Sequence, residues 1–135
     1  VTALQAPTAP TVYTPTANDT DISILQTDKI VLIKHVQLTG LQCTLPSANL
    51  VNGQQVVIKN FQIGDGAAQG LGTDYQITVR PAQSQSPAHK LDYKFDSLLL
   101  QANSASSGDY ASPNESCRLV WVSVDATWVA LADNF

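Results

Sequence analysis

The stretch Cys117-Arg-Leu-Val-Trp-Val-Ser-Val-Asp-Ala-Thr-Trp-Val-Ala-Leu-Ala132 decides the fold class of this chain. Two runs rich in Val, Leu and Trp flank a short polar break at 125–127, which is the pattern of two antiparallel strands joined by a tight turn. Alternate residues of the first run form two sets on opposite faces of the strand. The sets are Leu119, Trp121 and Ser123 on one face and Val120, Val122 and Val124 on the other. Because both faces are largely apolar, the second face needs another sheet or another subunit to cover it.

Upstream of this hairpin, short runs with strand composition or strand alternation follow one another. They are 22–25, 29–38, 42–45, 54–61, 75–80, 91–95 and 97–101. Loops separate the later runs: a glycine-rich segment at 64–74, a polar segment at 81–90 and a long polar segment at 102–115. No stretch has the period of a long amphipathic helix. The pattern indicates an all-β sandwich, jelly roll or barrel, and we predict an antiparallel β-sandwich or jelly-roll-like domain over residues 20–135.

Residues 1–19 form a Pro- and Thr-rich segment with no charge before Asp19. Proline removes the backbone donors that a sheet needs and favours extended backbone in the residue before it, so we predict an extended N-terminal arm outside the sheet. The arm is either a disordered tail or an ordered strap along a neighbouring subunit, because several of its residues offer surface to bury. The residues that would make such contacts are Leu4, Pro7, Pro10, Val12, Tyr13 and Pro15.

The composition excludes some classes of partner. Charged residues make up only 13% of the chain, about half the usual share, and Gln, Asn, Ser and Thr replace them. That balance suits a protein whose surface is mostly in contact with other protein, or one that must remain soluble without strong electric fields. Seven basic against eleven acidic residues, without a basic cluster, leave no footprint for nucleic acid. No run is long enough to span a membrane and no signal peptide is visible, so we expect a complete protein made in a cytoplasm.

Two cysteines, Cys43 and Cys117, both lie in apolar strand-like runs. Buried free thiols are the favoured interpretation, since free Cys behaves as a small hydrophobic residue. A disulfide is the alternative, and it would require neighbouring strands and an oxidising environment.

The residues that could support catalysis or metal binding do not occur at useful spacings. His35 and His89 lack a second ligand at zinc-site spacing, and Asp65 and Asp74 beside the glycine loop lack the EF-hand order. The glycine loop has no Gly-Lys-Ser/Thr ending for phosphate, and no serine sits in a Gly-x-Ser-x-Gly elbow. We therefore expect a protein that is not an enzyme and that has no metal or cofactor.

Aromatic residues are few. Trp121 and Trp128 stand on the two strands of the hairpin, where packing in the core or at an interface is the favoured role. The four tyrosines are candidates for a carbohydrate-binding platform. They are Tyr13, Tyr75, Tyr93 and Tyr110.

The order of the strands resembles that in small β-rich domains of tailed-bacteriophage virion proteins. The residues that carry the resemblance are Val56-Val-Ile-Lys-Asn60, the glycine loop, Ile77-Thr-Val-Arg-Pro81 and Leu119-Val-Trp-Val-Ser-Val-Asp-Ala-Thr-Trp-Val129. It covers about residues 45–132 and leaves the arm and the segment 102–115 unexplained. It implies a homotrimer, as in tail-fibre tips, head fibres and capsid decoration proteins.

Residues and resemblance together predict a capsid decoration (cement) protein on the virion surface. It would trimerise and stabilise the head by contacting major capsid subunits, with residues 1–19 as the clamp. The residues expected at the trimer contact or in the core are Trp121, Val122, Val124, Trp128 and Leu131.

The alternative is a tail-fibre or head-fibre tip that recognises host glycans through its loops, with Tyr75 and Tyr110 as contacts. A third possibility is the accessory carbohydrate-binding domain of a secreted enzyme, which the absence of a signal peptide disfavours.

Overall fold

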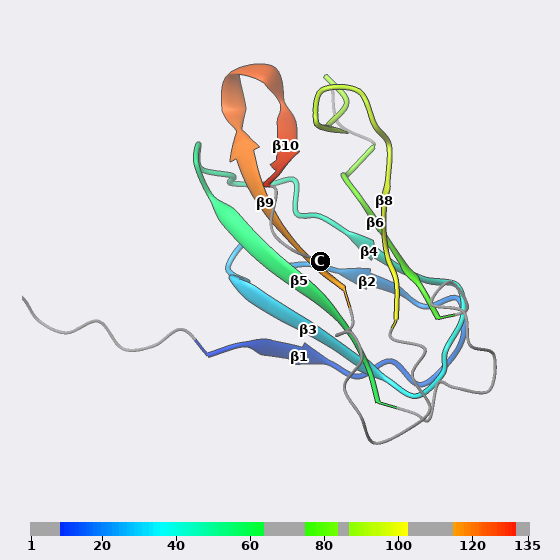
Figure 1. Ribbon diagram of the computed structural model, residues 1–135. Helices are drawn as coiled ribbons and strands as arrows, with labels where there is room; N and C mark the ends of the chain where they lie inside the picture. The colour runs from blue at the N-terminus through cyan, green and yellow to red at the C-terminus, as the bar shows by residue number, and fades with distance from the viewer. Residues whose placement is uncertain (1–8, 64–74, 84–86, 103–114, 132–135) are drawn as a thin grey trace, which may run out of the picture.

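A computed structural model describes residues 9–63, 75–83, 87–102 and 115–131, which fold into two facing β-sheets (Figure 1). The strands are β1 Thr11–Tyr13, β2 Asp21–Ser23, β3 Ile30–His35, β4 Leu41–Thr44, β5 Gln55–Gln62, β6 Ile77–Arg80, β7 Lys90–Leu91, β8 Leu98–Leu100, β9 Ser116–Val122 and β10 Thr127–Ala130. A short 3₁₀ turn, η2 Ser123–Asp125, joins the last two strands. The prediction of an all-β, two-sheet domain is confirmed.

The first six strands alternate between the two sheets. The six-stranded sheet has the order β1-β3-β5-β9-β10-β7, and the four-stranded sheet has the order β2-β4-β6-β8. Thr11 pairs with Val31 in one sheet, and Ile22 pairs with Cys43 in the other, both in parallel. Each consecutive pair of strands therefore makes one turn of a flattened coil.

The antiparallel prediction is wrong for this coiled half of the domain. The pairs β1–β3, β3–β5, β2–β4 and β4–β6 are all parallel, whereas β9 and β8 add antiparallel strands to β5 and β6. The reason lies in the connections. Between β1 and β5 the chain crosses to the opposite sheet and then crosses back. The two crossings together return it to the first sheet in its original direction, whereas a single hairpin would reverse it.

The prediction that residues 1–19 stay outside the sheet is wrong for residues 11–13, which form β1 at the edge of the six-stranded sheet. Asp28, buried in the turn before β3, holds this strand in place. Its carboxylate accepts hydrogen bonds from Thr11 Oγ1 at 2.9 Å, the Tyr13 hydroxyl at 2.6 Å and the Leu25 backbone N–H at 2.9 Å. The flanking Pro10 and Pro15 lie outside the strand, where proline is tolerated.

The predicted C-terminal hairpin is confirmed, with Trp121 opposite Trp128 in an antiparallel pair. Its first strand is shorter than expected, because the chain enters the 3₁₀ turn at Ser123. Ala126 closes that turn in the left-handed region, and its N–H donates to the Ser123 carbonyl. Val124 therefore lies in the turn and not in the strand. Its side chain is 88% exposed, so Val124 is not in the core, and its expected place at a trimer contact stays a prediction.

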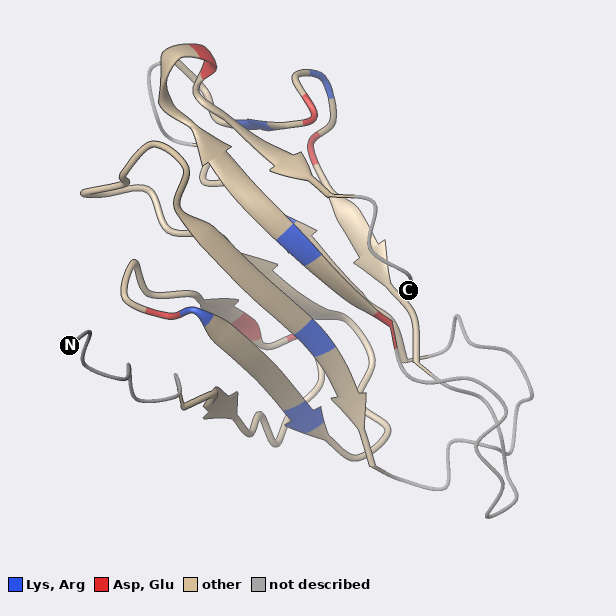
Figure 2. Ribbon diagram, turned by 60° about the vertical axis from the view of Figure 1, so that its left-hand side comes forward, with Lys and Arg blue, Asp and Glu red and all other residues tan. Residues whose placement is uncertain are grey.

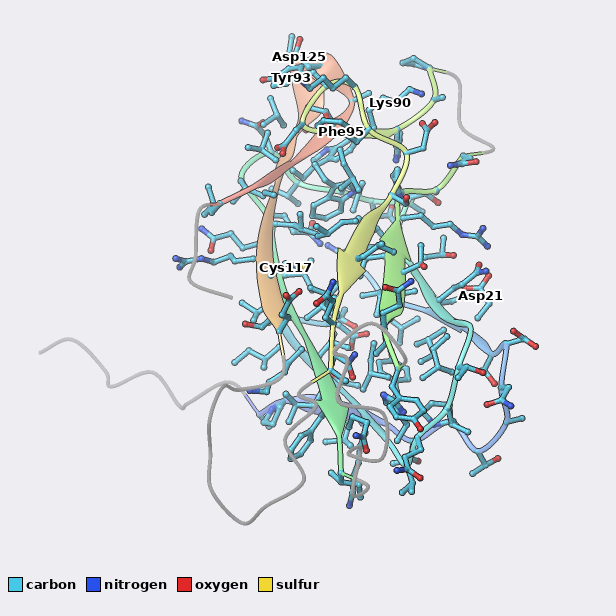
Figure 3. The ribbon with its side chains drawn as sticks, turned by 45° about the vertical axis from the view of Figure 1, so that its right-hand side comes forward. Asp21, Lys90, Tyr93, Phe95, Cys117 and Asp125 are labelled. Carbon is cyan, nitrogen blue, oxygen red and sulfur yellow. The ribbon has the colours of Figure 1, made fainter. Side chains whose placement is uncertain are left out.

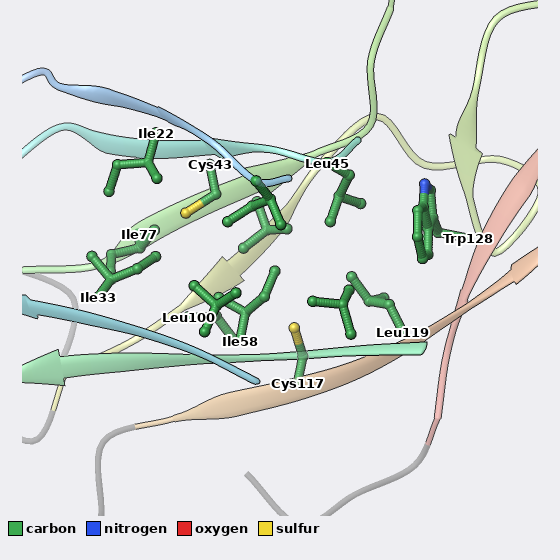
Figure 4. Close-up of a cluster of buried hydrophobic side chains, with 14 of the residues drawn as sticks. Ile22, Ile33, Cys43, Leu45, Ile58, Ile77, Leu100, Cys117, Leu119 and Trp128 are labelled. Atoms are coloured by element: carbon green, nitrogen blue, oxygen red, sulfur yellow. The ribbon is translucent and has the colours of Figure 1, made fainter. Parts of the chain in front are cut away.

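The core lies between the sheets and is formed by the inward residues of both (Figure 4). Its members are Ile22, Ile24, Val31, Ile33, Leu41, Cys43, Leu45, Val56, Ile58, Ile77, Val79, Leu91, Leu100, Cys117, Leu119, Trp121 and Trp128. Cys43 and Cys117 come from opposite sheets, are buried and form no disulfide, which confirms the prediction of buried thiols. Burial raises the pKa of the Cys43 thiol far above its usual value, so the thiol is unreactive in the folded protein.

One polar cluster lies within this core. Asn60 of β5 is completely buried, and its amide donates to the carbonyls of Tyr75 at 2.9 Å and Leu100 at 3.0 Å. Its Oδ1 accepts from His35 Nε2 at 2.9 Å, while His35 Nδ1 accepts from the Leu38 N–H. These bonds connect the six-stranded sheet to the ends of β6 and β8, and they fix His35 as the neutral Nε2–H tautomer.

Candidate docking surface

The outer faces of the two sheets differ in chemistry. The four-stranded sheet turns mostly polar side chains outward, with Leu99 as the apolar exception. They are Asp21, Ser23, Gln42, Thr44, Thr78 and Arg80. Arg80 and Asp21 form an ion pair at 3.0 Å on this face. This is the usual outer surface of a sandwich that faces water.

Most outward side chains of the six-stranded sheet are apolar. No described element covers this face (Figure 2). Its apolar members are the half-buried Ile30, Leu32, Val57, Val120, Val122 and Val129 and the exposed Val12 and Phe61. The second apolar face that the hairpin sequence predicts is therefore present.

Three cations lie among these apolar side chains. Lys34 of β3, Lys59 of β5 and Arg118 of β9 all point outward, and the pairing registers place them on a diagonal across three adjacent strands. Figure 2 shows these strands crossed by blue segments and free of red ones. No strand of the six-stranded sheet contains an acidic residue. The face is thus cationic, although the chain carries a net charge of −4.

A groove of about 380 Å³ lies at the corner of this face, where the chain leaves β1 and β3. We call it the corner groove, and its lining residues are Thr14, Pro15, Thr16, Lys34, His35, Val36, Leu38 and Ile63. Val36 and Ile63 are 58% and 48% exposed, which is unusual for large aliphatic side chains. His35 is buried in its wall, and burial lowers the pKa of His35 below its ordinary value. His35 therefore adds no charge to the groove wall at neutral pH.

A second exposed feature lies at the end of the sandwich formed by η2 and the turn after β7. Tyr93, Phe95 and Asp125 gather there (Figure 3). The rings of Tyr93 and Phe95 are 60% and 50% exposed. Tyr93 sits at a positive φ of 70°, and its N–H donates to Thr127 Oγ1 at the start of β10. The turn after β7 is therefore fastened to the hairpin.

The structure separates the residues predicted for the arm. Leu4 and Pro7 lie outside the described residues. Pro10 is exposed, Val12 lies on the outer face of the six-stranded sheet, and Pro15 lines the corner groove. Tyr13 is half-buried beside Asp28, as described above.

The residues predicted for the trimer contact or core divide between two environments. Trp121 and Trp128 are in the core, with ring centroids 5.4 Å apart. Val122 and Leu131 are half-buried, Val122 on the outer face. Of the glycan candidates, Tyr75 is half-buried and Tyr110 lies outside the described residues, as does the glycine loop with Asp65 and Asp74.

Within the described ranges, no group of three or more His, Cys, Asp or Glu side chains is placed to hold a metal ion. The same residues include no helix long and apolar enough to cross a membrane.

Sequence reasoning missed the diagonal of cations and the corner groove. The outward position of Lys34, Lys59 and Arg118 could have been read from alternation with the buried residues beside them. Their convergence depends on the pairing register, which alternation does not specify.

Comparisons with models of known protein families, with curated proteins and with solved structures each find no match for this chain.

Proposed function

We propose that this protein is a non-enzymatic subunit of a larger protein assembly, and that it attaches through the outer face of its six-stranded sheet. The observation that carries the proposal is the contrast between the two outer faces, one polar and one apolar with three cations. A monomeric sandwich gains nothing from an uncovered apolar sheet face, whereas the core of a protein interface has this composition.

The charges on the face specify the kind of partner. A twofold dimer through this face would set Lys34, Lys59 and Arg118 of one copy against those of the other, with no carboxylate from the strands between them. Like charges brought together in this way oppose association. The partner surface is therefore acidic and apolar, and it belongs to a different protein or to a different face of a neighbouring copy.

The most specific form of the proposal is a capsid decoration protein on the virion of a tailed phage. Its support is the resemblance of residues 45–132 to virion β-domains, together with a low charge content and a face suited to shallow, extended contact. In this role the protein forms a homotrimer and binds the assembled lattice of major capsid subunits, which stabilises the head by mass action.

The experiment combines light scattering with sedimentation. We expect a trimer by mass, and we expect it to co-sediment with expanded, undecorated phage heads. Lys59→Glu should weaken head binding about tenfold by placing a carboxylate opposite the acidic partner, while Lys94→Glu, in the turn between β7 and β8 beside Phe95, should leave it unchanged. A monomer that ignores the heads would contradict the decoration role.

A second candidate function is glycan recognition at a fibre tip, and it is favoured by Tyr93 and Phe95. The two exposed rings sit on a turn fixed by backbone hydrogen bonds, near Asp125 (Figure 3). Sugar rings pack their C–H faces on aromatic rings and donate hydroxyl hydrogen bonds to carboxylates. Binding on a glycan array that is lost in Tyr93→Ala, together with indifference to phage heads, would favour this function over decoration.

A further inference from the structure

We infer that the corner groove is the anchoring pocket of the docking face, and that it receives a large apolar side chain that the partner protein carries next to an Asp or Glu. The inference rests on the proposed docking function and adds to it the chemistry of the partner's central contact.

The size and lining of the groove define the apolar part of this ligand. Its volume of about 380 Å³ is close to the lower end of protein ligand sites, roughly 300 Å³, and admits one side chain with its backbone. The aliphatic part of the lining comes from Pro15, Val36, Leu38 and Ile63. Val36 and Ile63 expose about half of their surface, so a bound side chain removes that surface from water.

The groove offers one charge to the ligand. Among the lining residues that the structure describes, Lys34 alone is charged, because burial and the bond from the Leu38 N–H to Nδ1 keep His35 neutral. Among the residues that the structure describes, Lys34 forms no ion pair. An ammonium group at the rim of an apolar groove selects a ligand with an adjacent carboxylate and disfavours one with a cation.

The walls are formed before the ligand arrives. The Leu38 N–H donates to His35 Nδ1, and Gln37 between them adopts a positive φ of 54°, so the turn after β3 is fixed. The Ile63 N–H donates to the His35 carbonyl at 2.9 Å, which fixes the position of Ile63 beside this turn. Because the pocket is formed before binding, little free energy is lost in ordering its side chains and loops. This favours the pocket as the anchoring point of an interface.

The groove is also continuous with the docking face. Lys34 belongs to both, and its register partner on β5 is the exposed Phe61. Val12 of β1 extends the apolar surface on the side of Leu32. A partner that covers the outer face therefore reaches the groove without a separate contact.

The test uses the intact protein and two short peptides, N-acetyl-Leu-Glu-amide and N-acetyl-Leu-Lys-amide, titrated by NMR. We expect the acidic peptide to shift the backbone amides of Thr16, Val36 and Ile63 and to bind at least fivefold more tightly than the basic one. Lys34→Gln should remove the difference between the peptides. No binding of either peptide, or equal binding of both, would overturn the inference.

Groove variants on phage heads separate this inference from the proposed function. The double variant Val36→Ser, Ile63→Ser should reduce head binding at least tenfold, while Val51→Ser, which changes an aliphatic side chain that is 63% exposed and lies outside the groove, should not. If Lys59→Glu abolishes head binding and the groove variants keep it, the docking function stands and the groove inference fails. If no form of the protein binds heads but the acidic peptide binds at the groove, the groove inference stands and the decoration role fails.

Discussion

At the scale of single residues, Asn60 connects the two sheets more directly than any apolar contact. It is fully buried, and its side chain accepts one hydrogen bond and donates two. Removing a buried partner leaves each of these groups unsatisfied, at a cost of about 1–3 kcal/mol per group. The sequence shows an Asn at the end of a Val-rich strand and gives no sign of this role, because the acceptors come from β8 and from the residue at 75.

Asn60→Ala should therefore lower the free energy of unfolding by about 3 kcal/mol, measured by urea denaturation. Asn52→Ala is the matched control. Asn52 accepts only an exposed hydrogen bond from the Ser123 N–H, and its loss should cost less than about 1 kcal/mol. Equal effects of the two substitutions would contradict the role given to Asn60.

His35 makes the stability of the protein depend on pH. Burial lowers its pKa in the folded state below the ordinary 6.5, so the unfolded chain binds a proton that the folded protein does not. Stability from this group is present above pH 6.5 and is lost as the pH falls towards the lowered folded pKa. Burial lowers the pKa of His89 in the same direction.

Urea midpoints should accordingly fall between pH 7.5 and pH 5.5, above the range in which ordinary carboxylates titrate. The His35→Gln side chain retains a donor and an acceptor but does not titrate. The urea midpoint of this variant should therefore fall less between the two pH values than that of the unchanged protein, and His89 should account for the fall that remains. A midpoint that rises on acidification would contradict the neutral, buried state of His35.

At the scale of elements, the sequence predicts strands well and their connections poorly. Runs at 29–38, 54–61 and 75–80 become β3, β5 and β6 with small shifts of their ends. Alternation is the same in parallel and antiparallel strands, so it cannot reveal that the chain crosses between sheets after each strand. The strands begin at residues 11, 21, 30 and 41, and this regular spacing is a sign of the coil. The sequence alone does not reveal the spacing, because the prolines around β1 predict an arm and not a strand.

β1 depends on Asp28 for its place in the sheet. Burial and the hydrogen bond to Asp28 raise the pKa of Tyr13 to about 12, so its hydroxyl stays protonated between about pH 10 and pH 12, where an unfolded tyrosine loses its proton. The stability that this group contributes is present below pH 10 and is lost as the pH rises through 12.

Tyr13→Phe should release β1 while leaving the core folded. Removing a hydrogen bond to a carboxylate costs about 1.5–3 kcal/mol, and the strand is short and lies at an edge. Hydrogen exchange should become faster at the amides of β1 and of the β3 edge beside it, with the β5 and β9 amides unchanged. Unaltered protection of β1 would show that Asp28 does not hold it.

At the scale of the whole molecule, the two outer faces give the protein a polar side and an apolar, cationic side, which is the proposed docking side. The sequence of β9 predicted that both of its faces are apolar, and the structure adds that the uncovered face is cationic. Composition alone could not show this, since the net charge is −4 and the cations are spread over three strands.

Docking through such a face should weaken with salt. In the proposed complex, Lys34, Lys59 and Arg118 would meet carboxylates of the partner at the surface. Raising the ionic strength from 0.05 to 0.5 M shortens the screening length there from about 14 to about 4 Å. Head binding measured at both ionic strengths should fall about tenfold or more. Binding that strengthens with salt would indicate that apolar contact alone carries the interface.

The most direct test of the docking face is hydrogen–deuterium exchange on the protein, free and bound to undecorated phage heads. We expect the backbone of β3, β5 and β9 and the turn at 36–38 to gain protection on binding, while β2, β4 and β6 of the polar sheet stay unchanged. Protection confined to the four-stranded sheet, or to the end that carries Tyr93 and Phe95, would contradict the assignment of the docking face.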